Sequence, residues 1–277
     1  MLSLSRVRRI TSRQNSLVAG YRAVARGEVP DMVLLDGVHL VADALAAGIP
    51  IHSAAVAIED AAGTADEALR ALIGRLNDAS VDLVDAPASV MAALSPVRSP
   101  SAIVALADRP RHALDQIFAG PAPFVLIAVG VQDPGNIGAI IRVAEAGGAT
   151  GVVATGASAN PFGWKALRGS MGSALRLPVL DDVSPEQAVA DARQRGCRIL
   201  ATAPRGGTSV FDSVLTGALA VLIGGEGRGL AEAVLDLADA RVTIPMQAPV
   251  ESLNAAVTAA LIVYEARRQR GAVGVGR

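Results

Sequence analysis

Apolar positions along the second half of the chain alternate between short continuous runs and spaced stripes. Residues 124–129 (Phe-Val-Leu-Ile-Ala-Val) are apolar throughout, as expected for a strand buried on both faces. Strands alternating with helices form a parallel sheet, whose ligand sites lie beyond the carboxyl ends of the strands. Further strands are predicted at 151–154, 197–202, 218–223 and 241–244, and helices at 136–147, 162–171, 185–195, 229–236 and 252–268.

The first half repeats this alternation in a smaller α/β unit. Its strands are predicted at 33–35, 51–58, 81–84 and 103–107, and its helices at 38–47, 65–76 and 88–94. Between 108 and 123 three prolines and one glycine break the periodicity, which is typical of a linker. We therefore expect two domains, at residues 1–110 and 121–277.

Composition narrows the class of protein. Hydrophobic residues make up 51% of the 277 residues, enough for a sizeable core, yet no apolar run reaches the roughly 18 residues that span a bilayer. A single cysteine, Cys197, rules out an intramolecular disulfide and favours a cytoplasmic setting. His39, His52 and His112 are scattered, so no metal site is predicted.

The formal net charge of −1 means that a polyanion would have to bind a local basic patch. The first 25 residues offer one candidate, because their arginines have a spacing that suits a helical arm. These are Arg6, Arg8, Arg9, Arg13 and Arg22. Either they form a solvated helix face, or they contact phosphates.

Three segments at strand ends carry the candidate chemistry. In the first, Asn136 is a suitable helix N-cap, and the apolar stripe that follows leaves Arg142 off the core-facing side. Since a side chain leans toward the N-terminus of its helix, Arg142 points toward the strand end. A capped amphipathic helix with one surface arginine is the structural alternative.

The second segment surrounds Glu226 with four glycines, at 224, 225, 227 and 229. Such a run lets the backbone turn sharply and approach a ligand. Its spacing does not match G-x-G-x-x-G, and no Gly-Lys-Ser/Thr follows, so a dinucleotide fingerprint is a poor interpretation and a P-loop is excluded. A tight turn without a ligand is the alternative, although it leaves the lone carboxylate unexplained.

In the third segment Pro245 follows a strand, Ser252 is positioned to cap the last helix, and Asn254 falls in its first turn. The free N–H groups of a helix N-terminus favour negative charge. A cap with one further polar residue is the structural alternative.

The three segments together closely resemble the SpoU-type (TrmH-like) RNA ribose methyltransferases of the SPOUT class. The matching motifs are Asp-Pro-Gly-Asn-Ile-Gly-Ala-Ile-Ile-Arg at 133–142, Ile-Gly-Gly-Glu-Gly-Arg-Gly-Leu at 223–230, and Ile-Pro-Met at 244–246 with Ser-Leu-Asn at 252–254. Residues 165–172 and 10–15 are also similar to the family. The resemblance is dense over 121–270 and looser over 31–107, where Leu35-Asp36-Gly37 resembles an L30e-like RNA-binding domain.

The resemblance implies a trefoil knot in the C-terminal domain, against the general rule that chains are unknotted. It also implies a homodimer with a shared active site, and S-adenosylmethionine as the cofactor. The expected reaction is 2′-O-methylation of RNA. The small N-terminal domain favours ribosomal RNA. A tRNA substrate, a resistance enzyme acting on ribosomal RNA, and a catalytically silent RNA-binding protein are the alternatives.

Residue roles are carried over from the same resemblance. The catalytic candidates are Arg142, Asn136, Glu226, Ser252 and Asn254. The cofactor candidates are Thr202, Ala203, Gly224, Gly225, Ile244, Met246 and Leu253. The RNA-binding candidates are Arg6, Arg9, Arg13, Lys165, Arg168 and Arg176. Within the family the arginine is described as a general base, but a guanidinium has a pKa above about 12. Arg142 is therefore either that base or a group that fixes a phosphate and stabilises an alkoxide.

Overall fold

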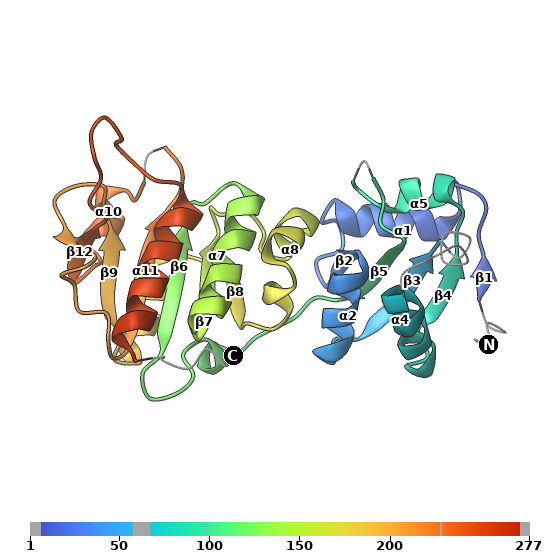
Figure 1. Cartoon of the computed structure of the whole chain (residues 1–277), viewed down its shortest axis with the longest axis horizontal. Helices are drawn as coiled ribbons and strands as arrows, with labels where there is room; N and C mark the ends of the chain where they lie inside the picture. The colour runs from blue at the N-terminus through green and yellow to red at the C-terminus, as the bar shows by residue number, and fades with distance from the viewer. Residues whose placement is uncertain (1–6, 58–66, 98, 228, 272–277) are drawn as a thin grey trace. The chain divides into compact units, whose positions relative to one another are not determined.

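The structure, a computed structural model, describes residues 7–57, 67–97, 99–227 and 229–271. The chain divides into two units (Figure 1). Unit 1 comprises Met1–Pro110 with Phe162–Arg176, and unit 2 comprises Arg111–Pro161 with Leu177–Arg277. The grouping of Phe162–Arg176 with unit 1 is not indicated by the sequence pattern.

Unit 1 contains a five-stranded sheet with the order β1-β4-β3-β5-β2, in which β5 runs antiparallel to both of its neighbours. The strands are β1 (Arg8–Arg9), β2 (Met32–Asp36), β3 (Ile51–Val56), β4 (Asp82–Asp85) and β5 (Ile103–Asp108). The helices are α1 (Ser16–Ala25), α2 (Val38–Ala46), α4 (Glu67–Asp78), α5 (Ala88–Leu94) and α8 (Trp164–Ser170), followed by the 3₁₀ turn η1 (Ser173–Leu175). Of the predicted elements, residues 58, 65 and 66 lie outside the described residues.

The helical arm predicted at the N-terminus is helical only from Ser16 to Ala25, and the prediction is wrong for Arg8, Arg9 and Arg13. Arg8 and Arg9 form the edge strand β1 against β4, and α1 begins only at Ser16, where the Asn15 side chain accepts a hydrogen bond from Leu17 N. Side-chain pairing explains the extended segment, since Arg8 forms an ion pair with Asp82 and Arg9 one with Asp85.

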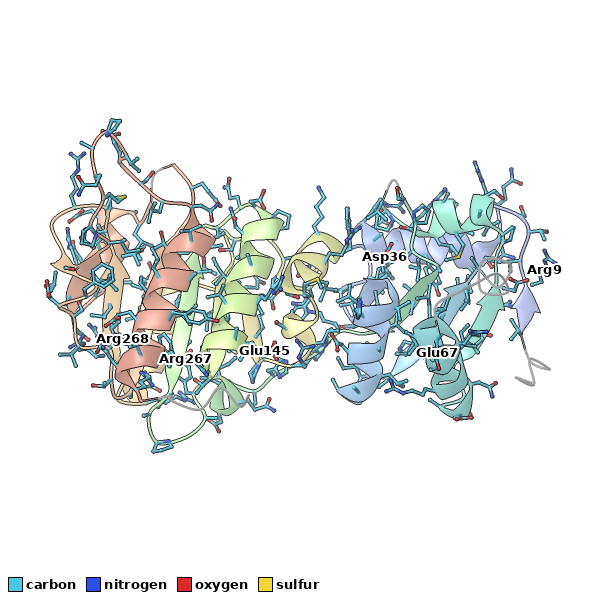
Figure 2. The ribbon with its side chains drawn as sticks, in the orientation of Figure 1. Arg9, Asp36, Glu67, Glu145, Arg267 and Arg268 are labelled. Carbon is cyan, nitrogen blue, oxygen red and sulfur yellow. The ribbon has the colours of Figure 1, made fainter. Side chains whose placement is uncertain are left out.

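A buried carboxylate joins the sheet of unit 1 to the connection between α5 and β5. Asp36 is 6% exposed at the end of β2 (Figure 2), and accepts hydrogen bonds from the hydroxyls of Ser95 and Ser101. Burial of a charge is tolerated where hydrogen bonds satisfy it. The turn that follows α5 is thereby tied to the sheet.

Unit 2 contains a seven-stranded sheet, parallel throughout, with the order β10-β12-β9-β11-β6-β7-β8. The strands are β6 (Phe124–Val129), β7 (Gly151–Thr155), β8 (Val179–Val183), β9 (Arg198–Thr202), β10 (Thr208–Ser209), β11 (Leu219–Gly224) and β12 (Ala240–Thr243). The helices are α6 (Leu114–Ile117), α7 (Pro134–Gly147), α9 (Pro185–Gln194), α10 (Glu232–Leu235) and α11 (Ala255–Gln269). The α/β fold and the parallel sheet are as predicted.

Helices cover the sheet of unit 2 on its two faces. Ala188, Val189 and Ala192 of α9 join one core cluster with apolar side chains of β6, β9 and β11. Helices α7 and α11 lie side by side (Figure 1), and a Cβ at Gly147 would overlap Val263 Cγ1. Because Gly147 has no side chain, α7 and α11 can approach this closely.

Three elements of unit 2 were not predicted. Strand β8 has adjacent aspartates, its register with β7 is irregular, and Asp182 has a φ of 59°. Strand β10 has only two residues, and α6 is a four-residue helix inside the predicted linker. Strand β10 and helix α6 are too short to show a clear period, and the two aspartates interrupt the apolar pattern of β8. Within the described part of the chain, no helix is long and apolar enough to cross a membrane.

Candidate active site

The first site segment opens α7. Asp133 is the N-cap, and its carboxylate accepts hydrogen bonds from the backbone N–H groups of Gly135 at 2.6 Å and Asn136 at 3.1 Å. The predicted cap at Asn136 is therefore wrong, because Pro134 occupies the start of the helix and shifts the cap to Asp133. The Asn136 amide is consequently available for contacts beyond its own helix.

The third site segment opens α11 in a similar way. Asn254 is the N-cap, with its Oδ1 accepting from Ala256 N at 2.9 Å and Val257 N at 3.2 Å. The predicted cap at Ser252 is also wrong, since α11 begins at Ala255 and Ser252 lies in the preceding loop. Because capping uses Oδ1, the amide nitrogen of Asn254 faces away from the helix.

A directional chain of hydrogen bonds joins the three segments. The Nδ2 group of Asn254 donates to Asn136 Oδ1 at 3.0 Å, and the Nδ2 group of Asn136 donates to Glu226 Oε1. Residues 90 and 118 positions apart in the sequence are thus brought into direct contact. Capping of α11 fixes the Asn254 amide, and this amide orients that of Asn136. The Asn136 amide in turn holds the Glu226 carboxylate.

The glycine loop that carries Glu226 is held against the end of β6. A Cβ at Gly225 would overlap the carbonyl oxygen of Gly130, so the two backbones meet without room for a side chain. Gly227 has a φ of 87°, a conformation that residues with a Cβ rarely adopt. The tight turn expected from the glycines is present, and it presents Glu226 at the surface.

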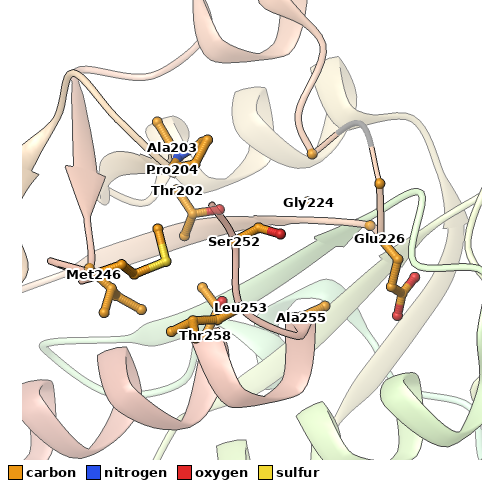
Figure 3. Close-up of a pocket in the computed structure, with 14 residues that line it drawn as sticks. Thr202, Ala203, Pro204, Gly224, Glu226, Met246, Ser252, Leu253, Ala255 and Thr258 are labelled. Carbon is orange, nitrogen blue, oxygen red and sulfur yellow. The ribbon is translucent and has the colours of Figure 1, made fainter. Parts of the chain in front are cut away.

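Beside this chain of hydrogen bonds is a pocket formed by the loops after β9, β11 and β12 (Figure 3). It contains about 720 Å³ of space between atoms, open solvent included. All seven predicted cofactor residues line it: Thr202, Ala203, Gly224, Gly225, Ile244, Met246 and Leu253. Glu226 and Ser252 line it as well.

Three residues that line the pocket with side chains were missed by the sequence interpretation: Pro204, Ala255 and Thr258. Pro204 continues the loop after β9, and Thr258 lies one helical turn after Asn254. The helix period would have identified Thr258, since residues four apart lie on the same face. Nothing in the pattern around Pro204 distinguishes it from an ordinary loop proline.

Arg142 lies apart from the chain of hydrogen bonds. It is exposed on α7, six residues beyond Asn136, which corresponds to about 9 Å along the helix axis. Among the described residues, none forms a hydrogen bond or ion pair with its guanidinium. The structure therefore brings together Asn136, Glu226 and Asn254 but leaves Arg142 open to a group from outside.

The predicted RNA-binding residues lie in unit 1, and several already have protein partners. Arg9 pairs with Asp85 at 3.4 Å, Arg13 Nε donates to the Ser89 carbonyl at 2.9 Å, and Arg176 pairs with Asp43 at 2.8 Å. Lys165 and Arg168 are exposed on α8. Arg6 lies outside the described residues.

Metal-ligating side chains do not cluster in the described part of the chain. Cys197 is buried one residue before β9, and this burial raises the pKa of its thiol, so the thiol is protonated at neutral pH. The polar groups of the pocket and of the adjoining hydrogen-bond chain are the amides of Asn136 and Asn254, the carboxylate of Glu226, hydroxyls and backbone atoms.

The amino-acid sequence is similar to those of known RNA methyltransferases. The model of the SpoU rRNA Methylase family matches residues 123–264. An uncharacterized tRNA/rRNA methyltransferase from Synechocystis sp. is 33% identical over 270 residues, covering 95% of this chain and 94% of that protein. The 23S rRNA (guanosine-2′-O-)-methyltransferase RlmB from Burkholderia sp. is 33% identical over 209 residues, covering 74% and 85%.

A solved structure extends the similarity to the fold. The SpoU methyltransferase AviRb from Streptomyces viridochromogenes, in complex with the cofactor AdoMet, aligns with a TM-score of 0.80 and 28% identity. The alignment covers 95% of this chain and all of that chain, 100%. The similarity thus extends across both units.

Proposed function

The chain belongs to the SpoU rRNA methylase family, and we infer that it transfers a methyl group from S-adenosylmethionine to a ribose 2′-hydroxyl of RNA, with ribosomal RNA as the substrate. The observation that carries this inference is the convergence of three distant loops. They form one pocket, and the Asn254–Asn136–Glu226 chain stands beside it.

The pocket has the chemistry that an adenosine derivative requires. Ala203, Ile244, Met246 and Leu253 offer apolar surface to a flat ring, while the glycine loop exposes backbone donors and acceptors. Of the described lining residues, only Glu226 carries a charge, and it is negative. When bound, S-adenosylmethionine supplies a methyl group activated by an adjacent sulfonium.

The remaining task for the protein is to position a weakly acidic hydroxyl and offset its proton. We assign Asn136, Glu226, Ser252 and Asn254 to orienting the target nucleotide beside the pocket. We assign Arg142 to the hydroxyl and its neighbouring phosphate. A guanidinium remains charged at neutral pH, so Arg142 stabilises the negative charge that develops on the oxygen, and the hydroxyl proton leaves to water as the methyl group moves from sulfur to oxygen.

The position of Arg142 supports a homodimer with a shared site. Within one chain its guanidinium does not join the Asn136–Glu226 contact, so a second copy would supply it. An exposed apolar stripe on α11 fits such an interface: Val257 is 47%, Leu261 39% and Tyr264 53% exposed. Apolar side chains at this spacing form one face of a helix.

Two further features of the family are proposed on the same basis. A trefoil knot would thread the segment from β12 to α11, and the contribution of that segment to the pocket supports this arrangement. Unit 1 would serve as an L30e-like RNA-binding domain, consistent with the exposed Lys165 and Arg168 on α8.

The test uses unmodified ribosomal RNA with labelled S-adenosylmethionine, followed by primer extension at low nucleotide triphosphate to map the modified residue. We expect one dominant stop. Arg142→Ala should lower the rate by at least about 100-fold, the range for loss of one transition-state donor, and Arg142→Lys should not restore it. Arg75→Ala, an exposed arginine on α4, is the charge-matched control.

Two outcomes would redirect this proposal. Label incorporated only into tRNA would assign the alternative substrate. Absence of S-adenosylmethionine binding in isothermal titration, with intact RNA binding, would favour a catalytically silent protein.

A further inference from the structure

Unit 1 contains a second hollow, which takes no part in the methyl-transfer site. It encloses about 630 Å³ of empty space, open solvent included, between the end of α1, the end of α5 with its following turn, and the start of α8. Its walls are mainly apolar. They include Ala25, Leu94, Pro96 and the half-buried indole of Trp164.

Positive charge stands at the rim of this hollow. Arg22 is fixed by its Nε group, which donates to the Ala93 carbonyl at 3.0 Å. Its two terminal nitrogens have no hydrogen bond to the described residues, so they are available to an anion. Lys165 adds an ammonium group 5.4 Å from the centre of the Trp164 ring.

The hollow is also rigidly built. Trp164 packs against the core cluster of unit 1, which contains Tyr21 and Met91. Ser95 lines the hollow and donates its hydroxyl to the buried Asp36, which fixes the turn after α5. A preformed site loses less conformational entropy when a ligand binds.

We propose that this hollow binds one nucleotide of a single-stranded RNA segment, with the base against Trp164 and the phosphate against Arg22. The inference rests on the proposed RNA substrate and adds a contact that lies outside the three catalytic motifs. An aromatic face with neighbouring arginines is the combination that holds unpaired bases, whereas duplex RNA keeps its bases stacked inside. A guanidinium with free terminal nitrogens suits a phosphate.

Trp164 makes the test direct, because it is the only tryptophan in the chain. Titration of the full-length protein with single-stranded tetraadenylate should quench tryptophan emission saturably and less strongly as salt increases. Inorganic phosphate and a short blunt RNA duplex, at matched ionic strength, should leave the emission unchanged. Emission that tetraadenylate leaves unchanged, or that phosphate changes equally, would overturn the proposal.

Substitutions distinguish the contribution of base stacking on Trp164 from that of the positive charge of Arg22. Trp164→Leu keeps apolar bulk but removes most of the stacking surface, and we expect KM for ribosomal RNA to rise about tenfold. Trp164→Phe should give a smaller rise, and Arg22→Gln should raise KM with a reduced salt dependence. The matched control is Arg75→Gln, an exposed arginine on α4 in the same unit, which should leave KM unchanged.

The outcomes distinguish this inference from the proposed function. If Trp164→Leu and Arg22→Gln transfer the methyl group with wild-type KM, the proposed nucleotide site is contradicted. The assignment of the enzyme activity is then unaffected. Absence of methyl transfer by the wild type would contradict the assignment, while quenching by tetraadenylate would still support an RNA site. Urea unfolding and the affinity for S-adenosylmethionine show whether each variant is folded. The tetraadenylate titration of the wild type tests the proposal even if a variant does not fold.

Discussion

Asn254 uses its two amide atoms for different purposes. Its oxygen caps α11, and its nitrogen donates to Asn136, which in turn holds Glu226. The Asn254 side chain therefore contributes both to the stability of α11 and to the geometry of the site. A substitution that keeps only one of the two atoms can distinguish these contributions.

We expect Asn254→Asp to keep the cap and lose the donor, because a carboxylate caps a helix as well as an amide does. Unfolding in urea should remain close to wild type, while methyl transfer falls up to about tenfold, because the hydrogen bond that orients Asn136 is lost. Asn254→Ala should lose both roles, with about 1 kcal/mol of stability. Equal activity in Asn254→Asp and wild type would show that the amide chain is not needed.

The types of the site residues were predicted better than their local roles. Sequence motifs identified Asn136, Glu226 and Asn254, which the structure brings into contact. Both helix caps were assigned to the wrong residue, because Asp133, Asn136, Ser252 and Asn254 are all suitable caps and the pattern alone does not rank them. Arg142 was predicted beside the site, and only its exposure is evident within one chain.

Helices α7 and α11 owe their close approach to Gly147. A methyl group there would overlap Val263 Cγ1. Gly147→Ala should therefore destabilise the protein by about 1–3 kcal/mol through overpacking. Urea unfolding measures this loss.

A double-mutant cycle supplies the control for that prediction. Val263→Ala opens space at the contact, so the pair of substitutions should cost less than the sum of the two single changes. Additive effects would mean that Gly147 and Val263 do not set the helix separation.

Elements with a strong period were predictable, and weakly patterned ones were not. The run at 124–129 is strand β6, and the stripe at 88–94 is helix α5, both with the predicted bounds. Strand β8 was missed because Asp181 and Asp182 interrupt its apolar pattern at the sheet edge. The grouping of α8 with unit 1 depends on contacts of Trp164 that no local pattern reveals.

The assembly of two chains is the largest feature that a single sequence leaves undetermined. Its proposed interface uses the exposed stripe Val257, Leu261 and Tyr264 on α11. Leu261→Asp should convert a homodimer to monomers in sedimentation and abolish methyl transfer. Val214→Asp, the same kind of apolar-to-charged change at an exposed residue away from the pocket, should do neither.

Subunit complementation tests the shared site itself. Co-refolded Arg142→Ala and Glu226→Ala chains should recover about a quarter of wild-type activity, since half of the randomly mixed dimers carry one complete site of two. Activity no higher than that of either variant alone would place Arg142 and Glu226 of the same chain in one site.

The atom that receives the methyl group decides whether this protein is a ribose methyltransferase. Tritium from labelled S-adenosylmethionine should enter unmodified ribosomal RNA, and alkaline hydrolysis should then release it in dinucleotides, because a methylated 2′-oxygen can no longer attack the neighbouring phosphate. Label recovered in mononucleotides would mean methylation of a base or of another position, and would contradict the assignment of a ribose 2′-hydroxyl as the acceptor.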